Sequence, residues 1–180
     1  GSEQHLPNSV PAPTTPLATI RRMSADSHPL LARIDDLLRP GSIPDWTRLL
    51  AMLTTHFDCP VGTVHLLADD DLLHLAAQQG LPPPVLDKVQ RIPIGKGMAG
   101  IAAERKEPVQ VCNLQSDQSG VVRPGAKLTQ MEGSLAVPML ANGTLRGVLG
   151  VAKPTAYEFQ PAETQLLLDV GARCARHLER

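Results

Sequence analysis

The stretch SLAVPMLANGTLRGVLGVA, residues 134–152, decides the fold. It consists of two apolar runs joined by the segment ANGT, residues 141–144. Asparagine followed by glycine accepts a positive φ at both central positions of a turn, as a type I′ β-hairpin requires. Each run is apolar at odd and even positions alike, so we expect both faces of this sheet to be covered.

A second hairpin is predicted upstream, where the runs at 61–68 and 72–78 flank an aspartate-rich turn at 69–71. If the loop has two residues, His65 lies directly opposite His74, whereas a three-residue loop separates them. Both registers remain open from the sequence. Two histidines are too few for a metal site, and no metal is predicted.

Helices are predicted on either side of these hairpins from the spacing of apolar residues and from proline and glycine at the ends. Strands joined by hairpins imply a largely antiparallel sheet with helices on its faces, which is an α+β arrangement. Two further short strands are predicted, one ending at Ile94 and one at 109–114. The predicted helices lie at 29–38, about 44–57, 85–90, about 98–105 and about 161–178.

The length and composition fit one domain with a proline-rich extension. Residues 1–27 combine four prolines with serine, threonine and asparagine, and we expect a mobile tail there. Residues 28–180 are predicted to form a single domain whose core spans 43–180, because 180 residues leave hardly any room for two.

The charge and cysteine content exclude several classes of partner. The net charge is -1, from 17 basic and 18 acidic residues, so we expect no nucleic-acid or membrane partner. No apolar run approaches the roughly 18 residues of a membrane span. The three cysteines are widely separated and form no CxxC pair, which favours a reducing cytoplasm.

The stretch RIPIGKGMAG, residues 91–100, is a candidate ligand site. A helix that starts near Gly97 directs the amides of Gly97, Met98 and Ala99 outward with a partial positive charge, and Lys96 adds a full one. A carboxylate, nitrate or another small anion fits that arrangement. The alternative is a tight strand-to-helix turn in which glycine only permits the geometry.

Residues 115–133 form a long irregular connection, a length that is usually functional. As a lid, this segment could place Arg123, Lys127 and Met131 over a ligand, with Cys112 beside them at the preceding strand. The alternative is a solvated loop. These residues complete the candidate ligand-binding set, and no cofactor is predicted.

The chain resembles a GAF domain over roughly residues 43–180. The resemblance rests on IPIGKGMAG followed by IAAERKEPVQV, on GSLAVPML with ANGTLRGVLGVAKP, and on YEFQPAETQLLLDVGARCARHL. It implies a GAF/PAS-like sheet of five or six antiparallel strands with helices on both faces, and a pocket roofed by the Gly-x-Gly helix and the long segment. It also implies a homodimer built on the terminal helices, which signals to an output domain or a partner signalling protein.

Two specialised versions of the family are not matched. The positions of a cyclic-nucleotide signature retain only Lys153, Phe159 and Glu163, which predicts a Lys153–Glu163 ion pair without nucleotide binding. GAF-type free methionine sulfoxide reductases need cysteines around the Gly-x-Gly helix and in the long segment. Here no cysteine lies between 113 and 173, and Cys112 has no resolving partner nearby.

We therefore expect a non-catalytic sensor or regulatory domain that binds a small polar or anionic ligand, rather than an enzyme. One alternative is a ligand-free dimerisation scaffold, which predicts a pocket filled by its own leucine and methionine side chains. The other is a redox enzyme that acts on a small sulfur compound.

Overall fold

The computed structural model describes residues 28–117, 119–122, 127 and 129–179. The tail predicted at 1–27 lies outside these residues. In the described part of the chain, no helix is long and apolar enough to cross a membrane. The elements, in chain order, are α2 (Pro29–Leu37), α3 (Trp46–His56), β1 (Val61–Leu67), β2 (Leu72–Gln79), α4 (Pro83–Lys88), β3 (Arg91–Pro93), α5 (Gly97–Arg105), β4 (Val109–Val111), β5 (Gly133–Ala141), β6 (Thr144–Lys153) and α6 (Pro161–Leu178).

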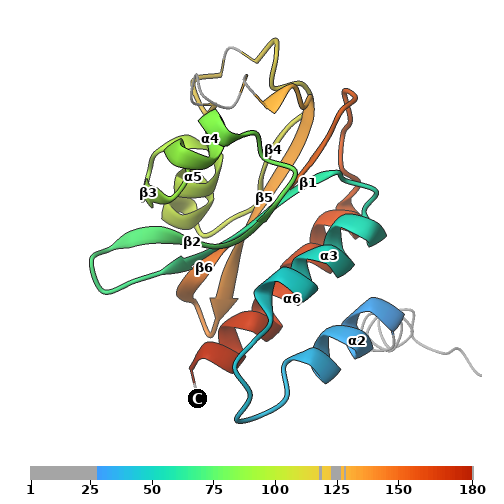
Figure 1. Ribbon diagram of the computed structural model, residues 1–180, viewed down its shortest axis with the longest axis vertical. Helices are drawn as coiled ribbons and strands as arrows, with labels where there is room; N and C mark the ends of the chain where they lie inside the picture. The colour runs from blue at the N-terminus through green and yellow to red at the C-terminus, as the bar shows by residue number, and fades with distance from the viewer. Residues whose placement is uncertain (1–27, 118, 123–126, 128, 180) are drawn as a thin grey trace, which may run out of the picture.

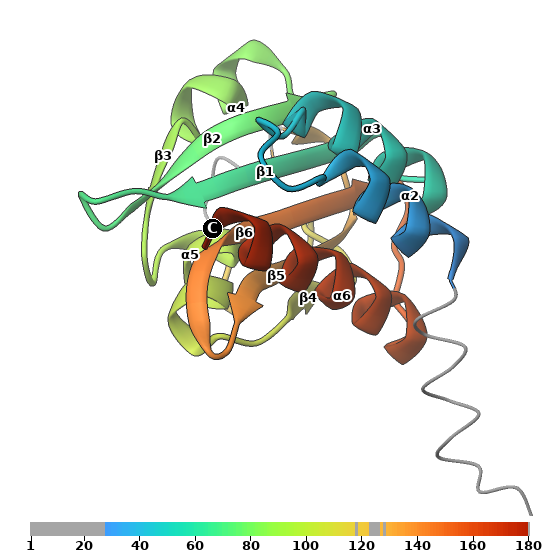
Figure 2. The same cartoon turned by 90° about the horizontal axis from the view of Figure 1, so that it is seen from below.

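The strands form one six-stranded sheet in the order β3-β2-β1-β6-β5-β4, and every neighbouring pair is antiparallel. Helices α2, α3 and α6 gather on one side of it, and α4 and α5 lie on the other (Figure 1). Figure 2 shows the same division from below. The predicted α+β sheet with helices on both faces is confirmed.

The β5–β6 hairpin closes at the predicted turn. Ala141 pairs with Thr144, and the two residues between them, Asn142 and Gly143, have φ of 51° and 77°. Both values lie in the left-handed region that a type I′ turn requires at its central positions. The Asn-Gly turn therefore fixes the register in which β5 and β6 pair. β6 also pairs with β1, and β5 pairs with β4.

The β1–β2 hairpin separates the two histidines. His65 pairs with Leu75 and Leu66 pairs with His74, because a register shift between Val64 and His65 offsets the strands. His74 is half-buried, and its Nε2 lies 2.7 Å from Oδ2 of Asp70. His65 is buried on the side of the sheet that carries α4 and α5. The direct His65–His74 pairing left open by the sequence does not form.

Each side of the sheet has its own apolar core. On the side of α2, α3 and α6, Leu135, Val137 and Met139 of β5 are fully buried among helix residues. On the other side, Ala136 packs with residues of α5 and β3. Consecutive residues of a strand point to opposite faces, so β5 contributes to both cores at once.

The predicted Lys153–Glu163 ion pair is wrong. Lys153 Nζ donates to the backbone carbonyls of Phe57, at 2.7 Å, and Asp58, at 3.2 Å. Glu163 accepts the hydroxyl of Tyr157 at 2.7 Å and the backbone N–H of Gln160 at 2.9 Å. The free amides at the start of α6 therefore take the carboxylate, and the carbonyls at the end of α3 take the ammonium group.

Candidate functional site

A pocket of about 510 Å³ lies on the side of the sheet covered by α4 and α5. Its floor is formed by β1, β5 and β6, its walls by α4, β3 and the start of α5, and its rim by described parts of the 113–132 connection. The lining of the floor includes Thr63, His65, Ser134, Ala136, Gly150 and Ala152. The lining of the walls includes Val85, Lys88, Val89, Ile92, Lys96, Gly97, Met98 and Ala99. The rim includes Leu114, Val122 and Thr129.

The floor is open because its residues are small. Ser134 and Ala136 of β5 pair with Ala152 and Gly150 of β6, and all four line the pocket. At Gly150, a Cβ would lie 2.8 Å from Oγ1 of Thr63. Because Gly150 has no side chain, the side chain of Thr63 can pack directly against β6. The alternation of small residues along both strands was the available sequence signal for this floor, and the sequence reasoning missed it.

The walls are mainly aliphatic. The aliphatic lining includes Val85 of α4, Val89 at its C-cap, Ile92 of β3, Met98 of α5 and Leu114. Among the described lining residues there is no phenylalanine, tyrosine, tryptophan, aspartate or glutamate. The pocket therefore offers dispersion contacts to an aliphatic group, and neither an aromatic ring for stacking nor a carboxylate for a cationic ligand.

His65 is the only polar residue of the described pocket floor whose side chain is almost fully buried, at 2% exposure. Its Nε2 lies 2.8 Å from the carbonyl oxygen of Val89, which can only accept, so Nε2 carries a proton. Burial lowers the pKa of His65, and the bond to Val89 offsets part of that effect. The ring is therefore neutral at pH 7, and its Nδ1 is a hydrogen-bond acceptor.

That acceptor has no partner among the described residues. Nδ1 of His65 is buried and makes no hydrogen bond to the protein there. A buried acceptor without a partner costs about 1–3 kcal/mol in desolvation. The sequence analysis considered His65 only in relation to His74 and did not anticipate that its ring would be buried and bonded to the carbonyl of Val89.

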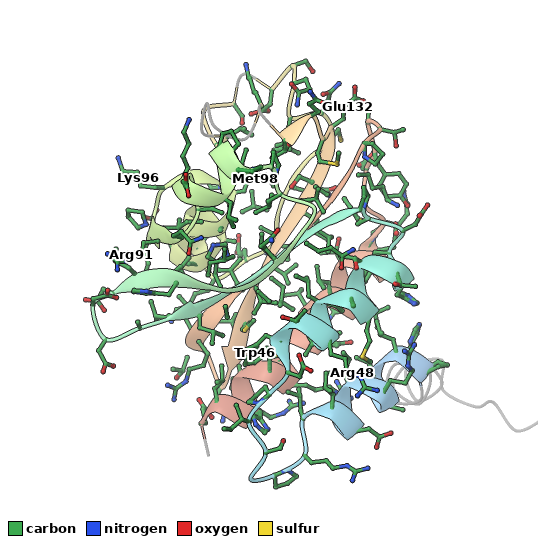
Figure 3. The ribbon with its side chains drawn as sticks, viewed as in Figure 1. Trp46, Arg48, Arg91, Lys96, Met98 and Glu132 are labelled. Carbon is green, nitrogen blue, oxygen red and sulfur yellow. The ribbon has the colours of Figure 1, made fainter. Side chains whose placement is uncertain are left out.

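Positive charge lies at the pocket wall. Lys88 and Lys96 both line the pocket and are exposed, and neither ammonium group has a hydrogen bond or an ion pair within the described chain. Lys96 is also the N-cap of α5 and provides no side-chain cap for that helix. Figure 3 shows Lys96 and Met98 on the α5 side of the sheet, away from Trp46 and Arg48 of α3.

The four candidate residues at the start of α5 come together at the pocket. Lys96, Gly97, Met98 and Ala99 are all lining residues. Gly97 has φ of 66°, and the carbonyl of Lys96 accepts the N–H of Gly100 at 3.2 Å. The glycine thus permits the corner, and the amides that precede Gly100 lie at the pocket wall.

Three of the other four candidates do not join them. Cys112 is exposed just after β4 and does not line the pocket. Lys127 is exposed, and Met131 is half-buried with its carbonyl accepting Nε2 of Gln115 at 2.8 Å; neither lines the pocket. Arg123 lies outside the described residues.

Comparison with known proteins identifies the fold. The family profile described as GAF domain matches residues 47–179. A search of curated proteins found no match. The GAF domain of a phosphoenolpyruvate-protein phosphotransferase from Coxiella burnetii has a TM-score of 0.67 at 20% identity, covering 83% of this chain and 90% of that chain.

Two further solved structures have similar scores. A free methionine-R-sulfoxide reductase from Neisseria meningitidis, in complex with its substrate, has a TM-score of 0.65 at 20% identity and covers 95% of each chain. A protein described as a GAF sensor from Burkholderia vietnamiensis has a TM-score of 0.64 at 22% identity, covering 89% of this chain and 94% of that chain. Likenesses at these identities show the fold alone.

The expectation that the chain is not an enzyme is contradicted. It rested on missing cysteines, yet proteins with this fold include free methionine-R-sulfoxide reductases from Neisseria meningitidis and Staphylococcus aureus. The fold hosts catalysis as well as regulation, so its presence does not argue against an enzyme. At about 20% identity it does not assign that reaction to this chain either.

Proposed function

The chain belongs to the GAF domain family, and on that premise we propose that it is a sensor or regulatory domain that binds a small organic molecule in its pocket. The observation that carries the proposal is the pocket itself. Its volume of about 510 Å³ falls in the range of roughly 300–1,000 Å³ typical of small-molecule sites. The scaffold alternative predicts a pocket filled by the protein's own side chains, and the open floor favours ligand binding instead.

The strands of the floor supply a route from the pocket to the terminal helices. Ser134 and Ala136 line the pocket, while Val137 and Met139 of the same strand lie in the core shared with α6. At Gly171 of α6, a Cβ would lie only 3.2 Å from the carbonyl oxygen of Pro138, so helix and strand are in close contact. A ligand that favours one packing of β5 therefore biases the position of α6.

The surface that passes the signal on is proposed to be formed by α2, α3 and α6. These three helices share the side of the sheet opposite the pocket. In this proposal two copies of the chain pair through those helices, and the pair reports ligand binding to an output domain or to a partner signalling protein. Hydrogen exchange along α6 that is the same with and without bound ligand would contradict this part of the proposal.

A thermal-shift screen tests ligand binding directly. Small organic acids, alcohols, amines, amino acids and nucleotides are added to the full chain, because a ligand that binds only the folded state raises its Tm. The matched controls are Ser134→Phe on β5 and Ala99→Leu on α5, which place larger side chains in the pocket. We expect the stabilising compound to lose its effect on both variants while both still unfold cooperatively. An unchanged Tm with every compound would overturn the proposal.

A further inference from the structure

We propose that the ligand of this pocket is a small uncharged aliphatic molecule with one hydrogen-bonding oxygen, an alcohol or a ketone, and that this oxygen binds the hydroxyl of Thr63. This inference rests on the proposed function and names the chemical class of its ligand. Three features of the described pocket carry it: the apolar surface open to an occupant, the free hydroxyl on the floor, and the exposed position of the charged lining residues.

The surface open to a ligand is mainly apolar. Leu81, Val89, Met98, Ala99 and Val122 line the pocket and are half-buried, so their side chains keep surface that an occupant can cover. Burial of each methylene of a ligand against such side chains tightens binding by about fourfold. No phenylalanine, tyrosine or tryptophan lines the described pocket, so an aromatic ring gains no stacking partner there. The lining therefore favours an aliphatic body.

The floor carries a hydroxyl that the described chain leaves free. Thr63 of β1 is half-buried and lines the pocket, and its Oγ1 makes no hydrogen bond to a described residue. Among these residues, the buried side-chain nitrogen and oxygen atoms without a partner are Nδ1 of His65 and Nε of Arg146. Oγ1 of Thr63 is not one of them, so this atom keeps surface that an occupant can reach.

The other polar groups of the floor and rim are engaged or closed off. The hydroxyl of Ser134 donates to a backbone carbonyl of β6 at 3.5 Å, and that of Thr129 accepts a backbone N–H at 3.1 Å. His65 offers a ligand neither of its ring nitrogens, because Nε2 is bonded to the carbonyl of Val89 and Nδ1 is buried. Thr63 therefore provides the hydroxyl of the described lining whose hydrogen-bonding capacity is wholly unused.

The strands leave room for a ligand beside this hydroxyl. Thr63 pairs with Gly150 of β6, which pairs in turn with Ala136 of β5, and all three residues line the pocket. A Cβ at Gly150 would lie 2.8 Å from Oγ1 of Thr63, so the hydroxyl lies over the glycine. A ligand that follows this row can place its oxygen against Thr63 and its carbon chain over Gly150 and Ala136.

The charged groups of the pocket favour a neutral ligand. Lys88 and Lys96 are the lysines of the described lining, which contains no other charged residue, and both are exposed. An exposed ion pair tightens binding by about fivefold at most, because water screens it. A carboxylate or an ammonium group beside Thr63 would lose its water without gaining a buried counter-charge. A hydroxyl both donates and accepts, so it binds an uncharged oxygen well.

The probe series is 1-hexanol, 2-hexanone, hexanoate, hexylamine and 1-chlorohexane, measured by calorimetry on the full chain at pH 7. We expect 1-hexanol and 2-hexanone to bind about tenfold or more tightly than hexanoate and hexylamine, which are charged at this pH. 1-Pentanol should bind about fourfold more weakly than 1-hexanol, because it buries one methylene less. Hexanoate that binds as tightly as 1-hexanol would overturn the proposal, and so would alcohol binding that does not depend on chain length.

Variants assign the oxygen to Thr63. Thr63→Val keeps the shape of the side chain and removes its hydroxyl. It should lower the ratio of 1-hexanol affinity to 1-chlorohexane affinity by about threefold to tenfold, the contribution of one hydrogen bond. Thr63→Ser keeps the hydroxyl and should preserve the ratio. Thr144→Val is the matched control, because this exposed strand threonine does not line the pocket. A ratio that is unchanged in Thr63→Val would also contradict the proposal.

The same measurements separate this inference from the function on which it rests. If organic acids, amino acids or nucleotides stabilise the chain, lose that effect in Ser134→Phe, and the neutral probes do not bind, the ligand class is wrong and the sensor proposal stands. If no compound of any class binds, both fall. Alcohol binding that Ser134→Phe and Ala99→Leu leave unaltered places the alcohols outside the pocket and overturns the inference alone.

Discussion

At the scale of single residues, His65 links the protein's stability to pH. Burial holds its pKa below the ordinary value of 6.5, so the unfolded chain takes up a proton that the folded chain does not. The contribution of His65 to the free energy of unfolding is therefore complete above about pH 6.5 and is lost as the pH falls below that value. Urea denaturation at pH 7.5 and at pH 5.5 should show this loss.

The variant His65→Gln should lose part of that pH dependence. Part of the pH dependence will remain, because the pKa of His56 is also lowered. Burial is the largest cause of that shift, and the charges of the nearby His28 and Arg33 add to it. His56→Gln is the matched variant and should retain the contribution of His65. If His65→Gln has the same slope of stability against pH as the unmodified chain, His65 is not the group responsible.

The three thiols should differ sharply in reactivity. Burial raises the pKa of Cys59 to about 11 and that of Cys174 to about 12, whereas Cys112 is exposed. Thiolate is the reactive form, so a disulfide reagent at pH 8 should modify only Cys112 of the folded chain and all three thiols in denaturant. Cys112→Ser should leave the folded chain inert. Rapid modification of a second thiol would show that the core that holds Cys59 and Cys174 opens.

Residue roles were predictable only where they depend on local sequence. The four residues 96–99 line the pocket, at a corner that glycine marks and where the helix begins directly after it, and their part in ligand binding stays a prediction. The role of His65 depends on a carbonyl 24 positions away, which no periodicity reveals. Its offset from His74 depends on a register shift that the alternation of apolar residues does not encode.

At the scale of elements, the start of α6 depends on one carboxylate. Glu163 accepts the backbone N–H of Gln160 and the hydroxyl of Tyr157, and the latter bond raises the pKa of Tyr157. Loss of such a cap costs about 0.5–2 kcal/mol. Glu163→Ala should therefore lower the free energy of unfolding by about 1 kcal/mol in urea titrations. Glu158→Ala removes an exposed carboxylate without a hydrogen bond in the described chain and should change it much less.

The ends of elements show what local patterns miss. The sequence predicts a helix at 85–90, whereas α4 starts at Pro83. Proline suits the first helical position because its missing N–H is not needed there. β4 ends at Val111 rather than at 114, because only three of its residues find partners on β5.

The helix α2 lies within the predicted domain of 28–180, but the predicted core of 43–180 did not include it. Leu30, Leu31 and Ile34 of α2 are almost completely buried in the core shared with α3 and α6. Arg173 of α6 also donates to Asp35 at 2.9 Å. A short amphipathic helix was predicted there, but its partner could not be read from a pattern that is the same for any apolar surface.

At the scale of the whole molecule, substitutions on the two sides of the sheet should differ in the property that they change most. Met139 is fully buried on the helix side and does not line the pocket, whereas Ser134 of the same strand does. Met139→Ala should cost about 2–5 kcal/mol in unfolding free energy and weaken binding of the compound found in the thermal-shift screen far less than Ser134→Phe does. Ser134→Phe should abolish binding at a smaller cost in stability. Equal effects of both variants on binding would show that the two sides are not separable.

The architecture was predictable because hairpins are local, and two of them fix four of the six strands. The character of the pocket was not. The sequence predicts a polar or anionic ligand from the Gly-x-Gly corner and from the cationic residues of the long segment, whereas most of the lining comes from strands and helices distant in sequence and is aliphatic. Whether such a fold regulates or catalyses depends on side chains in that pocket, which explains why an expectation drawn from missing cysteines failed.

The edge strands of the sheet also limit how copies of the chain can associate. The outermost strands, β3 and β4, have three residues each. An incoming strand would find too few free backbone groups along either border to extend the ladder, which protects the protein against fibril-like stacking. Copies of the chain should therefore associate through side-chain contacts. Such contacts can form and break without disrupting the hydrogen bonds of the sheet.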